Sequence, residues 1–170
     1  MMAGFSIEPA QESDIEGVQA VAAAGWRAAY RHVFSEEFIA ATLADWYSRE
    51  RLLESVRNPN GYFLVARQNG RVVGYAQVWD GRRGAELTRL YVLPDFWRQG
   101  IGAVLLAAGE AWLVERGHRS YFCYVEAHNE VGKSFYLNHG FVHLAERDEH
   151  EEMDEWYMWK DLNPPTEESH

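Results

Sequence analysis

Two glycines, Gly100 and Gly102, mark the point where an apolar strand pattern turns into a helix pattern, and this arrangement suits phosphate binding. The first N–H groups of a helix have no partner within the helix and lie at the positive end of its dipole. Glycines carry no Cβ atom, so a phosphate can approach these donors closely. The corner therefore predicts a seat for a diphosphate group.

The residues around the two glycines exclude two common phosphate sites. The corner lacks the third glycine of a dinucleotide fingerprint and the G-K-[ST] run of a P-loop. Instead, residues 97–102 (Trp-Arg-Gln-Gly-Ile-Gly) resemble the [QR]-x-x-G-x-[GA] motif with which GNAT acyltransferases hold the diphosphate of acetyl-CoA. Trp97 replaces the usual Gln or Arg, and Arg98 or Gln99 is expected to supply the polar contact. The resemblance implies coenzyme contacts by Arg98, Gln99, Gly100, Ile101, Gly102 and Ala103.

Two further segments carry the same resemblance. Residues 129–141 are similar to the family signature N-x-x-[AG]-x-x-[FL]-Y-x-x-x-G-F. Residues 26–31, Trp-Arg-Ala-Ala-Tyr-Arg, resemble a segment of many bacterial members in which the first helices form a wall of the acceptor pocket. By this resemblance Trp26 and Tyr30 bind the acceptor. At helical spacing, however, such aromatic residues also suit a core.

Hydrophobic periodicity and turn residues predict the order of elements. A capping box at Ser13 and Glu16 is expected to begin the first helix. The resemblance gives the GNAT fold: mixed α/β, with a mostly antiparallel twisted sheet of about six to seven strands and about four to five helices. The expected strands are 5–7, 62–67, 72–79, 86–93, 120–126, 141–147 and 156–162, and the expected helices are 15–30, one or two within 34–56, 101–115 and 130–138.

Composition limits the classes of function. The 170 residues fit one domain over 1–162, with 163–170 expected as a disordered tail. A net charge of −10 argues against general nucleic-acid binding and allows an amine substrate. Apolar runs are too short for a membrane span, and no signal-peptide pattern is recognised. Cys123 is the single cysteine, which favours a cytoplasmic setting. The seven histidines match no metal-binding pattern, and a homodimer is left open.

The resemblance also assigns chemistry to Tyr136 and Glu86. Tyr136 matches the tyrosine thought to protonate the departing CoA thiolate, although an aromatic residue there could simply pack in the core. Glu86 lies as far before Gly100 as the glutamate base of histone acetyltransferases in this superfamily. Burial would raise its pKa toward the working pH. The alternative for Glu86 is a solvated carboxylate at a strand end.

Residues of the preceding strand and of the following helix complete the expected site. In a regular strand Glu86, Thr88, Leu90 and Val92 would share one face, and Leu87, Arg89 and Tyr91 the other. The resemblance implies that the segment Leu90, Tyr91 and Val92 binds the coenzyme, with backbone groups near Leu90 and Val92 pairing with the pantetheine arm where the sheet splays. Asn129 could contact the same arm or cap its helix.

The resemblance implies transfer of an acetyl group from acetyl-CoA to a primary amine by direct attack in a ternary complex, with Glu86 also near the acceptor. A small amine or polyamine is favoured by the acidic balance and the aromatic first helices. A protein N-terminus or lysine is the alternative acceptor. A catalytically silent CoA-binding module is the alternative from another class, because Trp97 departs from the motif.

Overall fold

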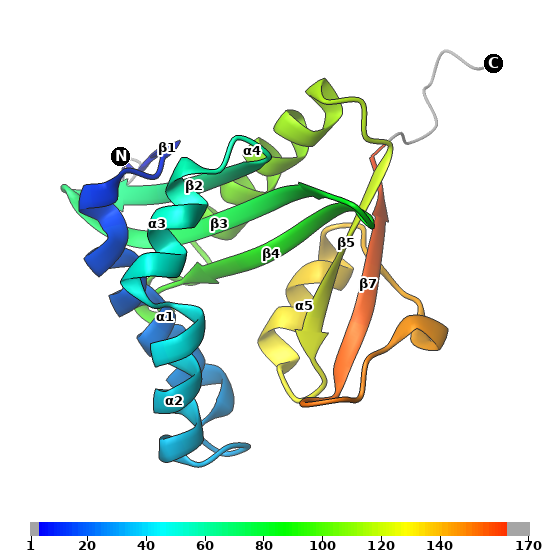
Figure 1. Ribbon diagram of the computed structural model, residues 1–170, viewed down its shortest axis with the longest axis horizontal. Helices are drawn as coiled ribbons and strands as arrows, with labels where there is room; N and C mark the ends of the chain where they lie inside the picture. Colours follow the sequence, from blue (N-terminus) through cyan, green and yellow to red (C-terminus); the bar gives the residue numbers. More distant parts are fainter. Residues whose placement is uncertain (1–3, 163–170) are drawn as a thin grey trace.

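The structure is a computed structural model that describes residues 4–162, so the expected tail at 163–170 lies outside the described residues. Its helices and strands follow the predicted order (Figure 1). The strands are β1 (Ser6–Pro9), β2 (Gly61–Gln68), β3 (Arg71–Gly81), β4 (Gly84–Val92), β5 (Ser120–Glu126), β6 (Val142–His143) and β7 (Glu155–Asp161). The α-helices are α1 (Ile15–Tyr30), α2 (Glu36–Trp46), α3 (Arg49–Arg57), α4 (Ile101–Glu115) and α5 (Glu130–Asn138).

All seven strands form one sheet in the order β1-β2-β3-β4-β5-β7-β6. Neighbouring strands are antiparallel except β4 and β5, which run parallel and are joined through α4. A parallel pair needs such a crossover because its strands cannot be linked by a tight turn. The mixed α/β prediction with a mostly antiparallel sheet is confirmed.

Helices cover both faces of the sheet. Helix α1 packs on one face, where Gly17 lies against Val72 and Gly25 lies against the ring of Tyr91. Helix α4 packs on the other face, with Gly109 against Val78. Helix α5 joins α4 on that face and shares an apolar cluster with the inward side chains of β5. The two faces therefore have separate roles: α1 to α3 line one side of the site and α4 and α5 line the other.

The first helix begins differently from the prediction. The expected capping box at Ser13 and Glu16 is wrong: a 3₁₀ turn over Glu12–Asp14 precedes α1. The carboxylate of Asp14 accepts the backbone N–H of Gln11 at 2.8 Å and also pairs with Arg67 of β2. Asp14 therefore takes part in a local cap with Gln11 and also makes a long-range ion pair with Arg67.

The last hairpin is shorter than predicted. The expected strand 141–147 is reduced to β6, after which the chain turns through a 3₁₀ helix at Ala145–Arg147. The carboxylate of Asp148 accepts the backbone N–H of Tyr157 at 2.7 Å, a donor that a longer β6 would have paired. A side chain therefore replaces the neighbouring strand at this point.

Candidate active site

Strands β4 and β5 separate almost as soon as they meet, and we call this opening the seam (Figure 1). Their register contains one pair, Glu86 with Phe122. On its other side β4 pairs with β3 at every residue except Thr88, and the N–H of Leu93 donates to the carbonyl of Val73 at 2.8 Å. Backbone groups alternate in direction along a strand, so the N–H groups of Val92 and Leu90 point away from β3 into the seam.

A β-bulge changes which side chains of β4 share a face. The register against β3 shifts so that Gln77 faces Arg89 while Val78 faces Leu87. Leu87 therefore packs in the cluster under α4, whereas Arg89 bonds to Ser55 of α3 on the opposite face. The strict alternation predicted for this strand is wrong, because Thr88 is the extra residue of the bulge.

The glycine corner has the geometry that its sequence predicts. Gly100 lies at φ +83° and Arg98 at φ +66°, so the chain turns through the left-handed region before α4 begins. The first helical bond of α4 runs from the N–H of Val104 to the carbonyl of Gly100, at 3.1 Å. The N–H groups before Val104 consequently have no partner within the helix. A phosphate seat at the start of α4 stays the prediction.

Gly102 is also needed for packing between helices. A Cβ atom there would lie 3.1 Å from the ring of Phe135, which belongs to α5. That separation is tighter than ordinary van der Waals contact, so the two helices approach closely because position 102 has no side chain.

Trp97 is bonded to the end of β4. Its indole N–H donates to the carbonyl of Val92 at 2.9 Å, and the side chain is 38% exposed. Arg98 and Gln99 lie exposed next to it. The carbonyl of Val92 thus has a partner, while its N–H faces the seam. Polar side chains for the coenzyme remain available at positions 98 and 99.

Tyr136 lies on α5 and is almost buried, in ring contact with Phe135 and Phe141. Burial, together with Cys123, Tyr30 and Tyr47, raises the pKa of its phenol well above the usual value. The phenol is therefore neutral at physiological pH. A phenol in this state is a hydrogen-bond donor rather than a strong acid, so it suits stabilisation of a thiolate.

Glu86 lies at the closed end of the seam, where β4 and β5 pair. Burial raises the pKa of its carboxyl group to about 7, opposed by the charge of Arg83 and assisted by Glu155. A carboxylate with this pKa can accept a proton near neutral pH. Glu86 is partly buried, so it is not a fully solvated strand-end carboxylate.

A cavity of about 320 Å³, here called the acceptor cavity, opens beside the seam. The predicted residues Trp26 and Tyr30 line it. Glu86 does not line it, but the charge of Glu155, which does, helps to raise the pKa of Glu86. The ring of Tyr91 also faces this cavity, on the side of α1. Its aromatic lining consists of Trp26, Tyr30, Trp46, Tyr47, Tyr91 and Tyr124.

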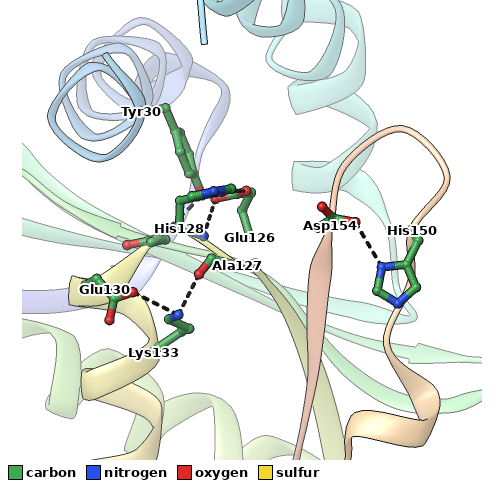
Figure 2. A network of polar contacts seen from close by, with 9 residues as sticks. Tyr30, Glu126, Ala127, His128, Glu130, Lys133, His150 and Asp154 are labelled. Atoms are coloured by element: carbon green, nitrogen blue, oxygen red, sulfur yellow. Dashed lines mark hydrogen bonds and ion pairs between the residues drawn. The ribbon is translucent and has the colours of Figure 1, made fainter. Parts of the chain in front are cut away.

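Two carboxylates on the cavity wall were missed by the sequence analysis. Glu126 ends β5 and accepts two bonds from His128, from the backbone N–H and from the ring, both at 2.7 Å. Figure 2 shows Tyr30 pointing toward this pair. Glu155 begins β7, and its carboxyl pKa is raised by burial and by nearby acidic groups, Glu126 among them. Glu155 is the last of seven acidic residues between positions 146 and 155, a run that is visible in the sequence. Only the fold shows that Glu155 reaches the cavity.

Asn129 caps α5. Its side-chain oxygen accepts the N–H of Gly132 at 2.9 Å, and its amide donates to the hydroxyl of Tyr30 at 3.3 Å. The capping alternative is therefore realised, and the bond to Tyr30 ties α5 to α1 across the seam. Lys133 supports the same turn by donating to the carbonyl of Ala127 at 2.5 Å (Figure 2).

Comparison with known proteins identifies the family. The family model for the acetyltransferase (GNAT) family matches residues 24–141. This chain belongs to the GNAT acetyltransferase family. It is 34% identical over 132 residues to the spermidine N(1)-acetyltransferase of Thermoplasma acidophilum, covering 75% of this chain and 82% of that protein. It is 32% identical to an uncharacterized N-acetyltransferase of Mycobacterium tuberculosis, covering 76% of this chain and 83% of that protein.

Solved structures agree with this assignment. The PaiA N-acetyltransferase of Thermoplasma acidophilum, crystallised with coenzyme A, superposes with a TM-score of 0.85 at 29% identity, covering 93% of this chain and 99% of that one. The ribosomal-protein-S18-alanine N-acetyltransferase of Escherichia coli shares the fold. It superposes with a TM-score of 0.65 at 20% identity, covering 98% of this chain and 99% of that one. The prediction of an acetyl-CoA-dependent N-acetyltransferase is confirmed.

Among residues 4–162, none of the helices combines the length and the apolar character that a membrane span requires. The same residues contain no group of three or more His, Cys, Asp or Glu side chains arranged to hold a metal ion.

Proposed function

We propose that this acetyltransferase acts on a primary amine of a small polyamine of the spermidine class. The observation that carries the proposal is the acceptor cavity, which combines aromatic rings with the carboxylates of Glu126 and Glu155. Aromatic faces and carboxylates both attract ammonium groups, so a chain with several positive charges would be held along its length. The spermidine acetyltransferase among the relatives supports the same substrate class.

We assign the chemical roles in the same proposal. Acetyl-CoA supplies the activated acetyl thioester. Glu86 accepts the proton of the acceptor ammonium, through water, because its pKa of about 7 leaves it partly ionised at neutral pH. The amine nitrogen then bonds to the acetyl carbon, and the carbon–sulfur bond breaks. The N–H of Val92 polarises the acetyl oxygen, and the hydroxyl of Tyr136 stabilises the leaving thiolate.

The proposal also assigns the diphosphate contacts, one wall of the acceptor site and the cellular location. The start of α4, from Gly100 to Ala103, holds the diphosphate, and Trp26 and Tyr30 form one wall of the acceptor site. Cys123 is buried and has no second cysteine in the sequence with which to form an internal disulfide. A single free cysteine suits a reducing compartment, so the proposal includes a cytoplasmic location.

Thiol release from acetyl-CoA, measured across a panel of amines, tests the substrate class. Spermidine should exceed butylamine in kcat/KM by about tenfold or more, since each additional ion pair in a partly buried site contributes about 1.4 kcal/mol or more. A lysine-containing peptide should react more slowly than spermidine. Equal rates for spermidine and butylamine, or a faster peptide, would contradict the proposal.

A matched pair of variants locates the recognition. Glu155→Gln should raise KM for spermidine severalfold and leave KM for butylamine nearly unchanged, because one amine does not reach this wall. Glu151→Gln is the control, since Glu151 is an exposed residue of the same acidic run. If both variants behave alike, general charge rather than the cavity wall attracts the substrate.

A further inference from the structure

Arg89 of β4 is a partly buried cation held only by neutral groups. Its guanidinium donates to the hydroxyl of Ser55 at 3.1 Å, to the side-chain oxygen of Gln77 at 3.2 Å and to the carbonyl of Trp46 at 2.9 Å. The ring of Tyr47 lies 5.0 Å away beneath it. A guanidinium has five N–H donors, so two remain for another acceptor.

Arg89 has no carboxylate partner within residues 4–162, in a protein whose net charge is −10. Charged side chains taken partly out of water are usually paired, because desolvation costs free energy that a counter-ion offsets. By comparison, Arg67 pairs with Asp14 and Arg116 pairs with Asp80. The fixed, unpaired guanidinium of Arg89 is therefore suited to receive an anion.

The position of Arg89 gives such an anion room. A second cavity, of about 260 Å³, adjoins the acceptor cavity and is lined by Ser55, Asn58 and Gln77 among others. Arg89 and Arg51 line both cavities, so they stand where the two meet. The partner of Arg51 is Asp45 at 3.3 Å, and both side chains are more than half exposed. Such a pair is weak, so Arg51 is free to turn toward a bound ligand.

We propose that Arg51 and Arg89 form a binding site for an oxyanion, a carboxylate or phosphate group, at the junction of the two cavities. Planar guanidinium groups suit both kinds of oxyanion, which they bind through paired N–H donors. Glu54 also lines the second cavity and opposes an anion there, but it is exposed and therefore screened by solvent.

The location of the site, combined with the proposed amine acceptor, gives it a function. Glu126 and Glu155 line the acceptor cavity along with the two arginines, so the cavity contains both acidic and basic groups. Arg89 would weaken the attraction of the cavity for a polyamine, and a bound oxyanion would offset the charge of Arg89. The oxyanion is either a free ion beside the amine or a carboxylate carried by the acceptor itself.

Binding of inorganic phosphate and of acetate to the protein without acetyl-CoA tests the site directly. Calorimetry at constant ionic strength should show saturable binding, weakened at least tenfold in Arg51→Gln. Arg57→Gln is the control, because Arg57 belongs to the same helix and has an equally exposed ion pair with Glu12. Arg89→Lys should also weaken binding, since it keeps the charge and loses the paired donors. Absence of saturable binding, or equal binding by the Arg51 and Arg57 variants, overturns the proposal.

Phosphate could also occupy the diphosphate seat at the start of α4. Binding there would be lost in Gly100→Asp and kept in Arg51→Gln, a result that overturns the arginine site. The reverse result supports it. This binding test does not depend on catalysis, whereas the proposed function fails if no amine releases thiol.

Kinetics with ornithine and putrescine, which differ by one carboxylate, identify the source of the oxyanion. If the acceptor carries it, ornithine should have the higher kcat/KM, and Arg51→Gln should reduce that preference about tenfold. If a free ion binds, phosphate should increase kcat/KM for putrescine in the wild type but not in Arg51→Gln. The two results separate the sources, and if neither occurs the proposal is overturned.

Discussion

The two sides of β4 differ, and the difference separates stability from binding. Toward β3, the strand is paired from Gly84 to Val92 with one interruption, the bulge at Thr88. Toward β5, it has one pair, at Glu86. The paired side forms a continuous sheet that holds the fold together. The open side leaves backbone donors unpaired, which costs stability but provides the groups that a ligand can bind. Substitutions near the open side should therefore impair binding or catalysis, and substitutions in the continuous sheet should impair stability.

The largest effect on the open side is expected from Gly100→Asp. A carboxylate at the start of α4 would repel the coenzyme diphosphate, so the dissociation constant for CoA should rise about 10³-fold, equivalent to about 4 kcal/mol. Gly117→Asp is the control, because Gly117 also has a positive φ in open space, at the opposite end of α4. Calorimetry measures both. A similar loss in the two variants would mean that backbone strain, and not the phosphate seat, is responsible.

Tyr136→Phe should lower kcat by about 10²- to 10³-fold with little change in CoA affinity, because a donor to the thiolate acts mainly in the transition state. Tyr121→Phe is the matched control. It removes another buried hydroxyl from the same cluster, one that donates to Glu110 at 2.5 Å. This control should lower the melting temperature and spare kcat. An unchanged kcat in Tyr136→Phe would assign that ring to packing alone.

Glu86→Gln should lower kcat/KM about a hundredfold. In the wild type, kcat/KM should rise with pH through about 7, because a base works only when ionised and burial sets the pKa of Glu86 at about 7. The variant should lose this inflection. Glu37→Gln, at an exposed position of α2, should keep it. A wild-type profile without the inflection would point to a different base.

Asp14→Asn tests the continuous sheet on the β3 side of β4, to which Asp14 is bonded through Arg67 of β2. This substitution should leave the kinetics intact. Asp14 is buried and Arg67 is 21% exposed, so losing the pair should lower the free energy of unfolding by about 2 kcal/mol, less than for a fully buried pair. Chemical denaturation measures this. Glu12→Gln, which alters exposed pairs, should change stability by less than about 0.5 kcal/mol. A larger effect on KM for acetyl-CoA than on stability would contradict the separation of roles.

The same ion pair has a defined pH dependence. Burial alone would raise the pKa of Asp14, but bonds from Arg67 and the Gln11 backbone outweigh it and leave the pKa below the usual value. Its contribution to stability is therefore complete above the unfolded pKa, near 3.9, and is lost as the pH falls through the lower folded pKa. Acid denaturation of Asp14→Asn should show a shallower dependence in that range.

Local patterns were sufficient to predict several elements. Helix α4, strand β5 and helix α5 have the bounds expected from periodicity and from glycines at their ends. These signals come from neighbouring residues, so they can be recognised in the sequence alone. The glycine corner and the burial of Trp26 and Tyr30 were predicted for the same reason.

Features that depend on distant residues were not predictable in this way. Asp14 pairs with Arg67 across 53 positions, a contact that no local pattern predicts, and the cap is made by Gln11 and Asp14 instead of Ser13 and Glu16. The bulge at Thr88 depends on the register with β3 and reversed the predicted face of Arg89. Glu155 and Arg89 line one cavity only because β4 and β7 are brought together by the fold. The turn at Gly100 and the aromatic wall of Trp26 and Tyr30 could thus be predicted from the chain, whereas the charged residues of the acceptor cavity could not.

The contact between Gly102 and Phe135 has an evolutionary consequence. A methyl group at position 102 would lie 3.1 Å from the ring of Phe135. The two helices can therefore keep their spacing only if the side chain at one of the two positions is small. Related sequences with alanine at the first position should therefore carry a smaller side chain at the second. The two positions are expected to covary, and lineages that keep phenylalanine should retain glycine.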